Sequence, residues 1–227
     1  GVIMMPAFAV GRTQELLFHL GCLYHRGLLS GWQVFLDSPM ALEVTRLYDQ
    51  WLDAMDKDDQ RVMAHFGARS LQEFLPVLSP TPDVEQSMRI NRIERGAIII
   101  AGSGMCNGGR IRHHLKHRLW QERNHLVFTG YQARGTLGRQ IVDGASHIRM
   151  FGQRFVVRAQ CHTLGGFSAH AGRNELLAWA KGIGGEPRFR LVHGEPEALE
   201  SLAGALSEMG IPVSVAEPQV AFSPDFS

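Results

Sequence analysis

The 227-residue chain has the composition of an ordinary globular protein and almost no net charge. Hydrophobic residues make up 44% of it and charged residues 20%, and the formal net charge is +1. Such a balance identifies no partner by itself, so any surface for nucleic acid has to be local. The longest apolar runs, such as Gly96–Gly102, are far shorter than the roughly 20 residues of a membrane-spanning helix, so we expect no membrane partner.

The cysteines predict the cellular compartment of the protein, and the first residues indicate whether the chain is a fragment. Cys22, Cys106 and Cys161 are widely spaced and form no CxxC pair. This usage argues against a disulfide framework and predicts a reducing, cytoplasmic location. Gly1 leads at once into the buried-strand pattern of Val2–Met5. A domain rarely starts inside its own core, so we expect a fragment of a longer protein.

Strand and helix patterns alternate over the first 55 residues. Val2–Met5 is predicted to be a buried parallel strand, and Thr13–Leu29 has leucines at helical spacing. A short strand at Val34–Leu36 and an amphipathic helix over Met40–Met55 follow. The alternation predicts parallel strands joined by crossover helices.

The pattern changes between Asp56 and Arg95, which is polar and interrupted by prolines. It predicts short helices at roughly 59–66, 70–76 and 82–92 and no clear strand. Ala97–Ala101 follows as a central strand.

The rest of the chain predicts a further series of alternating elements. These are a helix over Arg110–Trp120, a strand at His125–Thr129, a short helix over Gly135–Val142, a hairpin of His147–Phe151 and Arg154–His162, a helix over Gly172–Lys181, a strand at Phe189–Val192, a helix over Pro196–Met209 and a strand at Val213–Ala216. The whole predicts an α/β fold with an open, mainly parallel sheet flanked by helices.

A glycine-rich loop after the central strand is a candidate anion site. Gly102–Gly109 leads directly into a helix, whose first N–H groups and positive dipole end would face the loop. It matches neither a P-loop nor a dinucleotide-binding motif. On the pattern alone a tight structural turn is about as plausible. The helix that follows carries seven basic side chains, which are Arg110, Arg112, His113, His114, Lys116, His117 and Arg118. They favour a phosphate backbone, although a solvated helix face is the alternative.

A second strand-to-helix loop, Gly130–Leu137, offers similar chemistry. Tyr131 could stack on a base and Arg134 could pair with a phosphate, but a surface loop with a packed tyrosine explains the same pattern.

Two histidines near the carboxyl end of the chain are candidates for catalysis. His170 has small neighbours on both sides and Gly194 follows His193, so metal or substrate could approach closely. Two histidines do not complete a hydrolytic zinc site, which needs three protein ligands and an open position. The sequence contains no HxHxDH or HExxH cluster, and no elbow motif surrounds Ser168 to make it a nucleophile.

The ordered motifs resemble those of one known family, the β-CASP group of metallo-β-lactamase-fold nucleases, which process RNA. The resemblance rests on Pro6–Leu17, Leu36–Ala41, Ala101–Met105, Gly130–Leu137, Phe167–His170 and Val192–Glu195. It implies a β-CASP domain over residues 1–162, with its N-terminal part missing, and a partial αββα segment of the metallo-β-lactamase domain over residues 163–227.

The resemblance also implies a chemistry. In this family an HxHxDH cluster and further ligands bind two zinc ions, which activate a water for phosphodiester hydrolysis. It implies that His170 is the general acid near the scissile phosphate and that His193 is a zinc ligand. The family commonly has aspartate at the position of Gly172, so the chain departs from the family pattern there. The implied phosphate- and RNA-binding residues are Ser103, Gly104, Met105, Asn107, Gly108, Arg110, Arg134 and Ser168.

We therefore predict part of a zinc-dependent, RNA-processing nuclease whose partner is RNA. Because the HxHxDH cluster is absent from this sequence, we expect the chain alone to be inactive and to retain no catalytic zinc. The alternatives are an RNA- or phosphate-binding module and a non-catalytic scaffold of an RNA-processing complex. A homodimer is left open.

Overall fold

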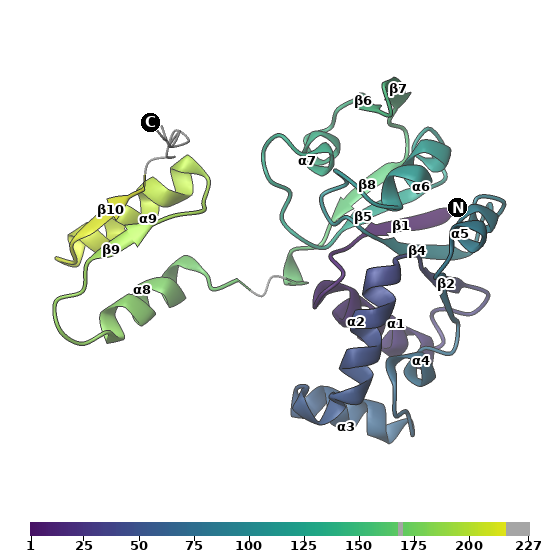
Figure 1. Cartoon of the computed structure of the whole chain (residues 1–227), viewed down its shortest axis with the longest axis horizontal. Helices are drawn as coiled ribbons and strands as arrows, with labels where there is room; N and C mark the ends of the chain where they lie inside the picture. Colours follow the sequence, from purple (N-terminus) through teal and green to yellow (C-terminus); the bar gives the residue numbers. More distant parts are fainter. Residues whose placement is uncertain (168–169, 217–227) are drawn as a thin grey trace, which may run out of the picture. The chain divides into compact units, whose positions relative to one another are not determined.

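The computed structural model describes residues 1–167 and 170–216. They belong to two compact units, Gly1–Ser168 and Ala169–Ser227 (Figure 1). The first unit contains a six-stranded sheet and a separate two-stranded hairpin, and the second contains a two-stranded sheet. Among the described residues, no helix is long and apolar enough to cross a membrane.

The strands are short, as expected for a domain of this size. In chain order they are β1 (Val2–Pro6), β2 (Gln33–Leu36), β3 (Leu78–Pro80), β4 (Ala97–Ala101), β5 (His125–Phe128), β6 (His147–Met150), β7 (Gln153–Val156), β8 (Gln160–Thr163), β9 (Phe189–Leu191) and β10 (Val213–Val215).

The helices alternate with these strands. They are α1 (Arg12–His25), α2 (Pro39–Gln50), the 3₁₀ turn η1 (Leu52–Ala54), α3 (Lys57–His65), α4 (Leu71–Phe74), α5 (Val84–Ile90), α6 (Ile111–Arg118), α7 (Leu137–Val142), the 3₁₀ turn η2 (Gly165–Phe167), α8 (Arg173–Gly182) and α9 (Pro196–Glu208). The start of α2 shows why such boundaries fall where they do. The Ser38 hydroxyl accepts a hydrogen bond from the Ala41 N–H at 3.3 Å, and Pro39 occupies the first helical position.

The six-stranded sheet is parallel throughout, in the order β3-β2-β4-β1-β5-β8. Every residue of β4 is buried because helices cover both faces of the sheet. This explains the continuous apolar run that marks the strand in the sequence. The predicted α/β class, with an open and mainly parallel sheet flanked by helices, is confirmed.

Side chains of β4 alternate between two hydrophobic clusters. Ile99 belongs to one cluster, with side chains of α6, α7 and β6. Ile98 and Ile100 belong to the other, with side chains of α1, α2, α3 and α4. The sheet is therefore the middle layer of a helix–sheet–helix sandwich (Figure 1).

The predicted hairpin is only partly correct. β6 and β7 do pair antiparallel, but the segment expected to be one strand from Arg154 to His162 divides in two. The N–H groups of Arg158 and Ala159 both donate to the Leu119 carbonyl at 2.9 Å and turn the chain. β8 then joins the main sheet, parallel to β5. All four β8 residues are exposed, so the sequence lacks the alternation that would have revealed this strand.

Two other predictions need correction. The prediction of no strand between Asp56 and Arg95 is wrong, because β3 pairs with β2 there. It has only three residues and ends in Pro80, which is tolerated at the edge of a sheet. The helix predicted over Met40–Met55 ends earlier, at Gln50, and continues as η1.

The second unit has a much smaller buried core. α8, β9, α9 and β10 follow one another, and β9 and β10 pair in parallel. Among its described residues only Ala180, Ala205 and Leu206 are buried. The boundary predicted between residues 162 and 163 stays a prediction.

Candidate functional site

The carboxyl ends of five strands meet at one edge of the main sheet, where ligands of open parallel sheets usually bind. β2, β4, β1, β5 and β8 are neighbours and run parallel. The segments after them comprise residues 7–11, 37–38, 102–110, 129–136 and 164. The candidate anion loop and the Tyr131 loop both belong to this set.

The segment after β4 closes into a loop around Ser103. The Ser103 N–H donates to the Gly108 carbonyl at 3.1 Å, and the Gly108 N–H donates to the Ser103 hydroxyl at 3.1 Å. The Cys106 N–H donates to the Ser103 carbonyl. Because the Ile111 N–H donates to the Gly102 carbonyl at 3.0 Å, α6 begins directly at this loop.

Two glycines of the loop are required by its shape. Gly109 has a φ of +72°, and a Cβ there would lie 2.2 Å from the Gly102 carbonyl oxygen. A Cβ on Gly104 would lie 2.7 Å from the ring of Phe8, which follows β1. A Cβ on Gly108 would meet no atom within 4 Å, so that side of the loop is open. The sequence pattern alone could not separate these three roles.

Three N–H groups of the loop are unpaired in the described residues, and of their residues Gly104 is buried, Met105 is half-buried and Asn107 is exposed. Within the described part of the chain, the backbone N–H groups of Gly104, Met105 and Asn107 donate no hydrogen bond. They lie just before α6, whose dipole places partial positive charge at this end. Unpaired amides beside a helix N-terminus are suitable donors for an anion such as phosphate.

The second predicted loop is joined to the first. The Gln132 side-chain amide donates to the Gly104 carbonyl at 3.0 Å, and the Asn107 side-chain oxygen accepts from the Leu137 N–H at 2.9 Å. The side chain of Asn107 therefore holds the loops together while its own N–H stays available. Sequence reasoning missed Gln132, whose only signal was its place in the Gly130–Leu137 motif.

A cavity of about 340 Å³ opens beside the second loop, at the ends of β5 and β8. Its lining residues are Phe128, Thr129, Gly130, Tyr131, Gln132, Arg139, Val142, Thr163, Leu164 and Gly165. Tyr131 is 55% exposed, and Arg134 is exposed in the same loop. The Thr129 hydroxyl is buried and has no hydrogen-bond partner in the described residues.

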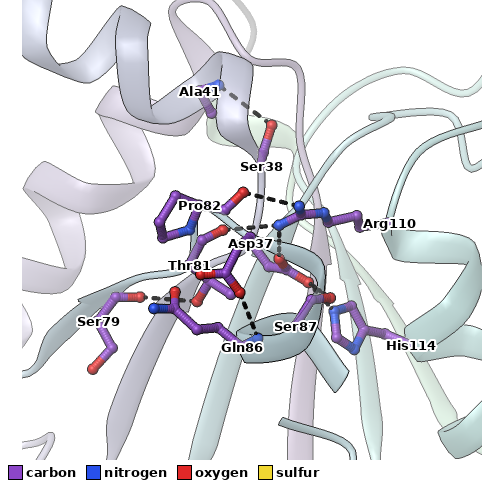
Figure 2. Close-up of polar contacts among 11 residues, drawn as sticks. Asp37, Ser38, Ala41, Ser79, Thr81, Pro82, Gln86, Ser87, Arg110 and His114 are labelled. Carbon is purple, nitrogen blue, oxygen red and sulfur yellow. Dashed lines mark hydrogen bonds and ion pairs between the residues drawn. The ribbon is translucent and has the colours of Figure 1, made fainter. Parts of the chain in front are cut away.

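Arg110 is held by the protein itself. Its guanidinium donates to the Asp37 carboxylate at 2.7 Å, to the Thr81 carbonyl at 2.8 Å and to the Pro82 carbonyl at 3.0 Å (Figure 2). These bonds tie the start of α6 to the ends of β2 and β3. The phosphate contact predicted for Arg110 stays a prediction, but its structural role is plain.

Asp37 is fully buried at the centre of this cluster. Its other carboxylate oxygen accepts from the Ser87 hydroxyl and from the His114 ring Nε2, each at 2.6 Å (Figure 2). Burial would raise the pKa of Asp37, but hydrogen bonds from His114, Ser87 and Arg110 outweigh it and hold that pKa below its ordinary value. Burial lowers the pKa of His114. The cluster therefore pairs an ionised Asp37 with Arg110 and a neutral His114, whose buried Nδ1 has no partner in the described residues.

Helix α6 presents fewer cations to solvent than its sequence suggests. Arg118 is 3% exposed and donates to the Ile90 and Ile93 carbonyls, and burial lowers its pKa to about 10. Like Arg110 and His114, it stabilises the fold. The remaining basic side chains are exposed or half-buried, and these are Arg112, His113, Lys116 and His117.

Cys106 lies inside the glycine loop but is no candidate nucleophile. Its side chain is fully buried, and burial raises the pKa of the thiol to about 12. All three cysteines are free.

The two candidate histidines belong to the second unit. His170 is exposed just before α8, and His193 is exposed after β9 with a φ of +59°. Ser168 lies outside the described residues. No group of three or more His, Cys, Asp or Glu side chains suited to a metal ion is found in residues 1–167 and 170–216. The described residues thus do not by themselves fit the zinc ions that the resemblance implies.

Comparison with known proteins identifies two family domains. The Beta-Casp domain matches residues 13–141, and the Zn-dependent metallo-hydrolase RNA specificity domain matches residues 154–216. A ribonuclease of Thermus thermophilus is 44% identical over 217 residues, which cover 95% of this chain and 48% of the relative. Transcription termination factor FttA of Pyrococcus abyssi is 32% identical over 213 residues, which cover 91% of this chain and 32% of the relative.

A third relative also matches most of this chain over less than half of its own length. An RNase J-like protein of Methanocaldococcus jannaschii is 29% identical over 197 residues, covering 86% of this chain and 43% of the relative. The chain thus spans from about a third to about half the length of these relatives. The predicted resemblance is confirmed: the chain belongs to the β-CASP group of metallo-β-lactamase-fold RNA-processing nucleases.

Proposed function

We propose that this chain supplies the RNA-holding part of a zinc-dependent ribonuclease, which hydrolyses phosphodiester bonds. Family membership supports the reaction class, and the ribonuclease of Thermus thermophilus supports RNA as the substrate. The description of the second matched domain supports zinc as the cofactor. The proposal does not specify which RNA sequence is bound. It also does not specify whether the enzyme is an endonuclease or an exonuclease.

The observation that carries the proposal is the loop after β4. Its N–H groups at Gly104, Met105 and Asn107 donate to no group in the described residues, and they lie at the carboxyl edge of the sheet beside the start of α6. A phosphodiester oxygen is an acceptor of matching charge. Ser103 and Gly108 close the loop and so position these donors.

The proposal gives the two histidines different roles. In a complete enzyme His170 would be the general acid beside the leaving oxygen, as the resemblance implies. His193 is one ligand of the metal centre. A zinc ion held by His193 together with further ligands would supply an activated water and neutralise charge on the phosphate. Because the described residues do not complete a ligand set, no hydrolytic step is assigned to this chain. Arg134 and Ser168 keep their predicted RNA contacts as part of the proposal.

The proposal predicts that the isolated chain binds single-stranded RNA without cleaving it. Fluorescence anisotropy with a labelled oligonucleotide should show affinity falling roughly 20-fold between 50 and 200 mM salt if three phosphates are contacted. Binding that does not change over this range would contradict the proposal. Zinc-dependent cleavage that is abolished by His193→Ala would contradict the prediction that the chain alone is inactive.

A matched pair of substitutions tests whether RNA binds at the glycine loop. Asn107→Asp keeps the side-chain oxygen that accepts from Leu137 but adds negative charge beside the loop amides. It should weaken RNA binding at least about tenfold, the effect of a repulsion of about 1.4 kcal/mol. Asn91→Asp is the control, because Asn91 likewise accepts through its side-chain oxygen, from Arg118. Equal affinities for the two variants would exclude the loop as the RNA site.

The non-catalytic scaffold is the second candidate function. The relatives named transcription termination factors favour it as an alternative, because that name describes a process other than RNA cleavage. A cleavage assay on a protein with a complete metal centre separates the two functions, because a scaffold would not cleave RNA.

A further inference from the structure

The tip of the β6–β7 hairpin carries an aromatic residue where the backbone does not favour one. Phe151 and Gly152 form the turn between the paired residues Met150 and Gln153. Their φ values are +50° and +73°. A two-residue turn with both φ positive favours Asn-Gly, and a bulky residue at the first position is unusual. The Phe151 side chain is nevertheless 43% exposed, so burial does not compensate for this conformation.

Cations of α6 surround this ring. The Arg112 guanidinium carbon lies 4.5 Å from the ring centroid, and the Lys116 ammonium nitrogen lies 6.0 Å from it. The His113 ring centroid is 5.0 Å away. Within the described ranges, no carboxylate lies within ion-pair distance of Arg112 or Lys116. The positive charge around Phe151 is therefore not neutralised by this part of the protein.

The hairpin itself adds more unbalanced charge. Arg149 and Arg154 lie directly opposite each other in the β6–β7 register, and both are exposed. Like charges at such a position destabilise a strand pair. The segment from His147 to Arg158 contains no aspartate or glutamate. An anionic partner would relieve this repulsion.

Arg112 connects Phe151 with the glycine loop. One of its guanidinium nitrogens donates to the Asn107 carbonyl at 3.4 Å, while the guanidinium carbon stacks over the Phe151 ring. A single side chain thus spans from the loop with the available amides to the tip of the hairpin. The two features form one continuous surface within the first unit.

We propose that Phe151 is a stacking platform for a base of single-stranded RNA, with flanking phosphates bound by Arg112 and Lys116. This inference rests on the proposed function, because the same strand would continue from the glycine loop. RNA fits this surface better than an acidic peptide, because it combines phosphates with flat bases that stack on aromatic rings. The platform would hold RNA of any sequence, since every base has a face that can stack.

The first test removes the aromatic ring of Phe151 without destabilising the turn. Phe151→Asn should weaken binding of a 12-nucleotide single-stranded RNA about tenfold, as loss of one stacked base does. Its melting temperature should stay unchanged or rise, because asparagine is favoured at this turn position. Phe151→Tyr should bind RNA like the original chain. The matched control is Trp51→Ala, which removes a 70% exposed aromatic side chain at the end of α2 and should not change the affinity.

The second test examines the charges. Arg112→Gln and Lys116→Gln should each reduce the slope of log affinity against log salt by about 0.7, the value for one phosphate contact on a single strand. An oligoglutamate of the same length should bind more weakly and without dependence on Phe151. Equal binding of oligoglutamate with the same dependence would assign the surface to acidic peptides and overturn the inference.

The outcomes separate this inference from the proposed function. If Asn107→Asp weakens RNA binding but Phe151→Asn does not, the platform is wrong and the loop site stands. If Asn107→Asp has no effect while Phe151→Asn weakens binding, the loop proposal fails and the platform stands as an independent RNA site.

Discussion

Asp37 joins three segments that are distant in the sequence. It follows β2 directly, whereas Ser87 lies on α5 and His114 on α6. Arg110, at the start of α6, adds the balancing charge. Because the Asp37 carboxylate is fully buried, water cannot replace these donors if one is lost. This residue therefore fixes the start of α6 and, with it, the end of the glycine loop.

Asp37→Asn should destabilise the first unit strongly. The amide removes the charge that pairs with Arg110, and breaking a buried ion pair costs about 3 kcal/mol. Urea denaturation should show this loss. Glu43→Gln is the control, because Glu43 pairs with Arg46 on the surface, where both side chains are 69% exposed. Its cost should stay below about 0.5 kcal/mol. Equal stabilities of the two variants would show that the cluster does not hold this edge together.

The glycine loop is the element that connects the fold with the proposed RNA binding. Its shape depends on hydrogen bonds around Ser103 and on the close approach of Gly109 to Gly102. α6 starts at the loop, and Gln132 joins it to the next loop along the edge. The direction of its amide groups thus follows from packing on several sides.

Gly109→Ala should both destabilise the chain and weaken RNA binding. The new Cβ would meet the Gly102 carbonyl at 2.2 Å, and the positive φ alone costs about 1–2 kcal/mol. Gly108→Ala is the matched control for stability, since nothing lies within 4 Å of the added carbon. Calorimetry on both variants checks the stability, and anisotropy on Gly109→Ala checks the binding. A Gly109→Ala variant as stable as Gly108→Ala would mean that the loop has another conformation.

The elements differ in how well the sequence predicts them. Ala97–Ala101 and the glycine loop were predictable, because a strand buried on both faces leaves a continuous apolar run that ends at a turn. β8 was predicted only as the end of a hairpin strand and not as part of the main sheet, because an exposed edge strand has no such run. The cluster around Asp37 could not be predicted either, since Arg110 and His114 are 73 and 77 residues away along the chain. Only the sheet topology brings them together.

At the scale of the whole molecule, the two units differ in how much core they bury. Both hydrophobic clusters lie in the first unit, whereas only three described residues of the second unit are buried. Segments with few buried contacts open more easily, so α8, α9 and their strands should exchange amide hydrogens faster than β1 and β4. The second unit carries His170 and His193, so the proposed acid and metal ligand belong to the unit with the smaller buried core.

Amide hydrogen exchange with and without single-stranded RNA tests the central claim most directly, because it reports on the loop amides themselves. We predict that RNA slows exchange in residues 103–109 of the original chain. We predict that this protection is lost in Asn107→Asp and kept in Asn91→Asp. RNA that binds tightly while exchange in residues 103–109 stays unchanged would contradict the claim that this loop holds the RNA backbone.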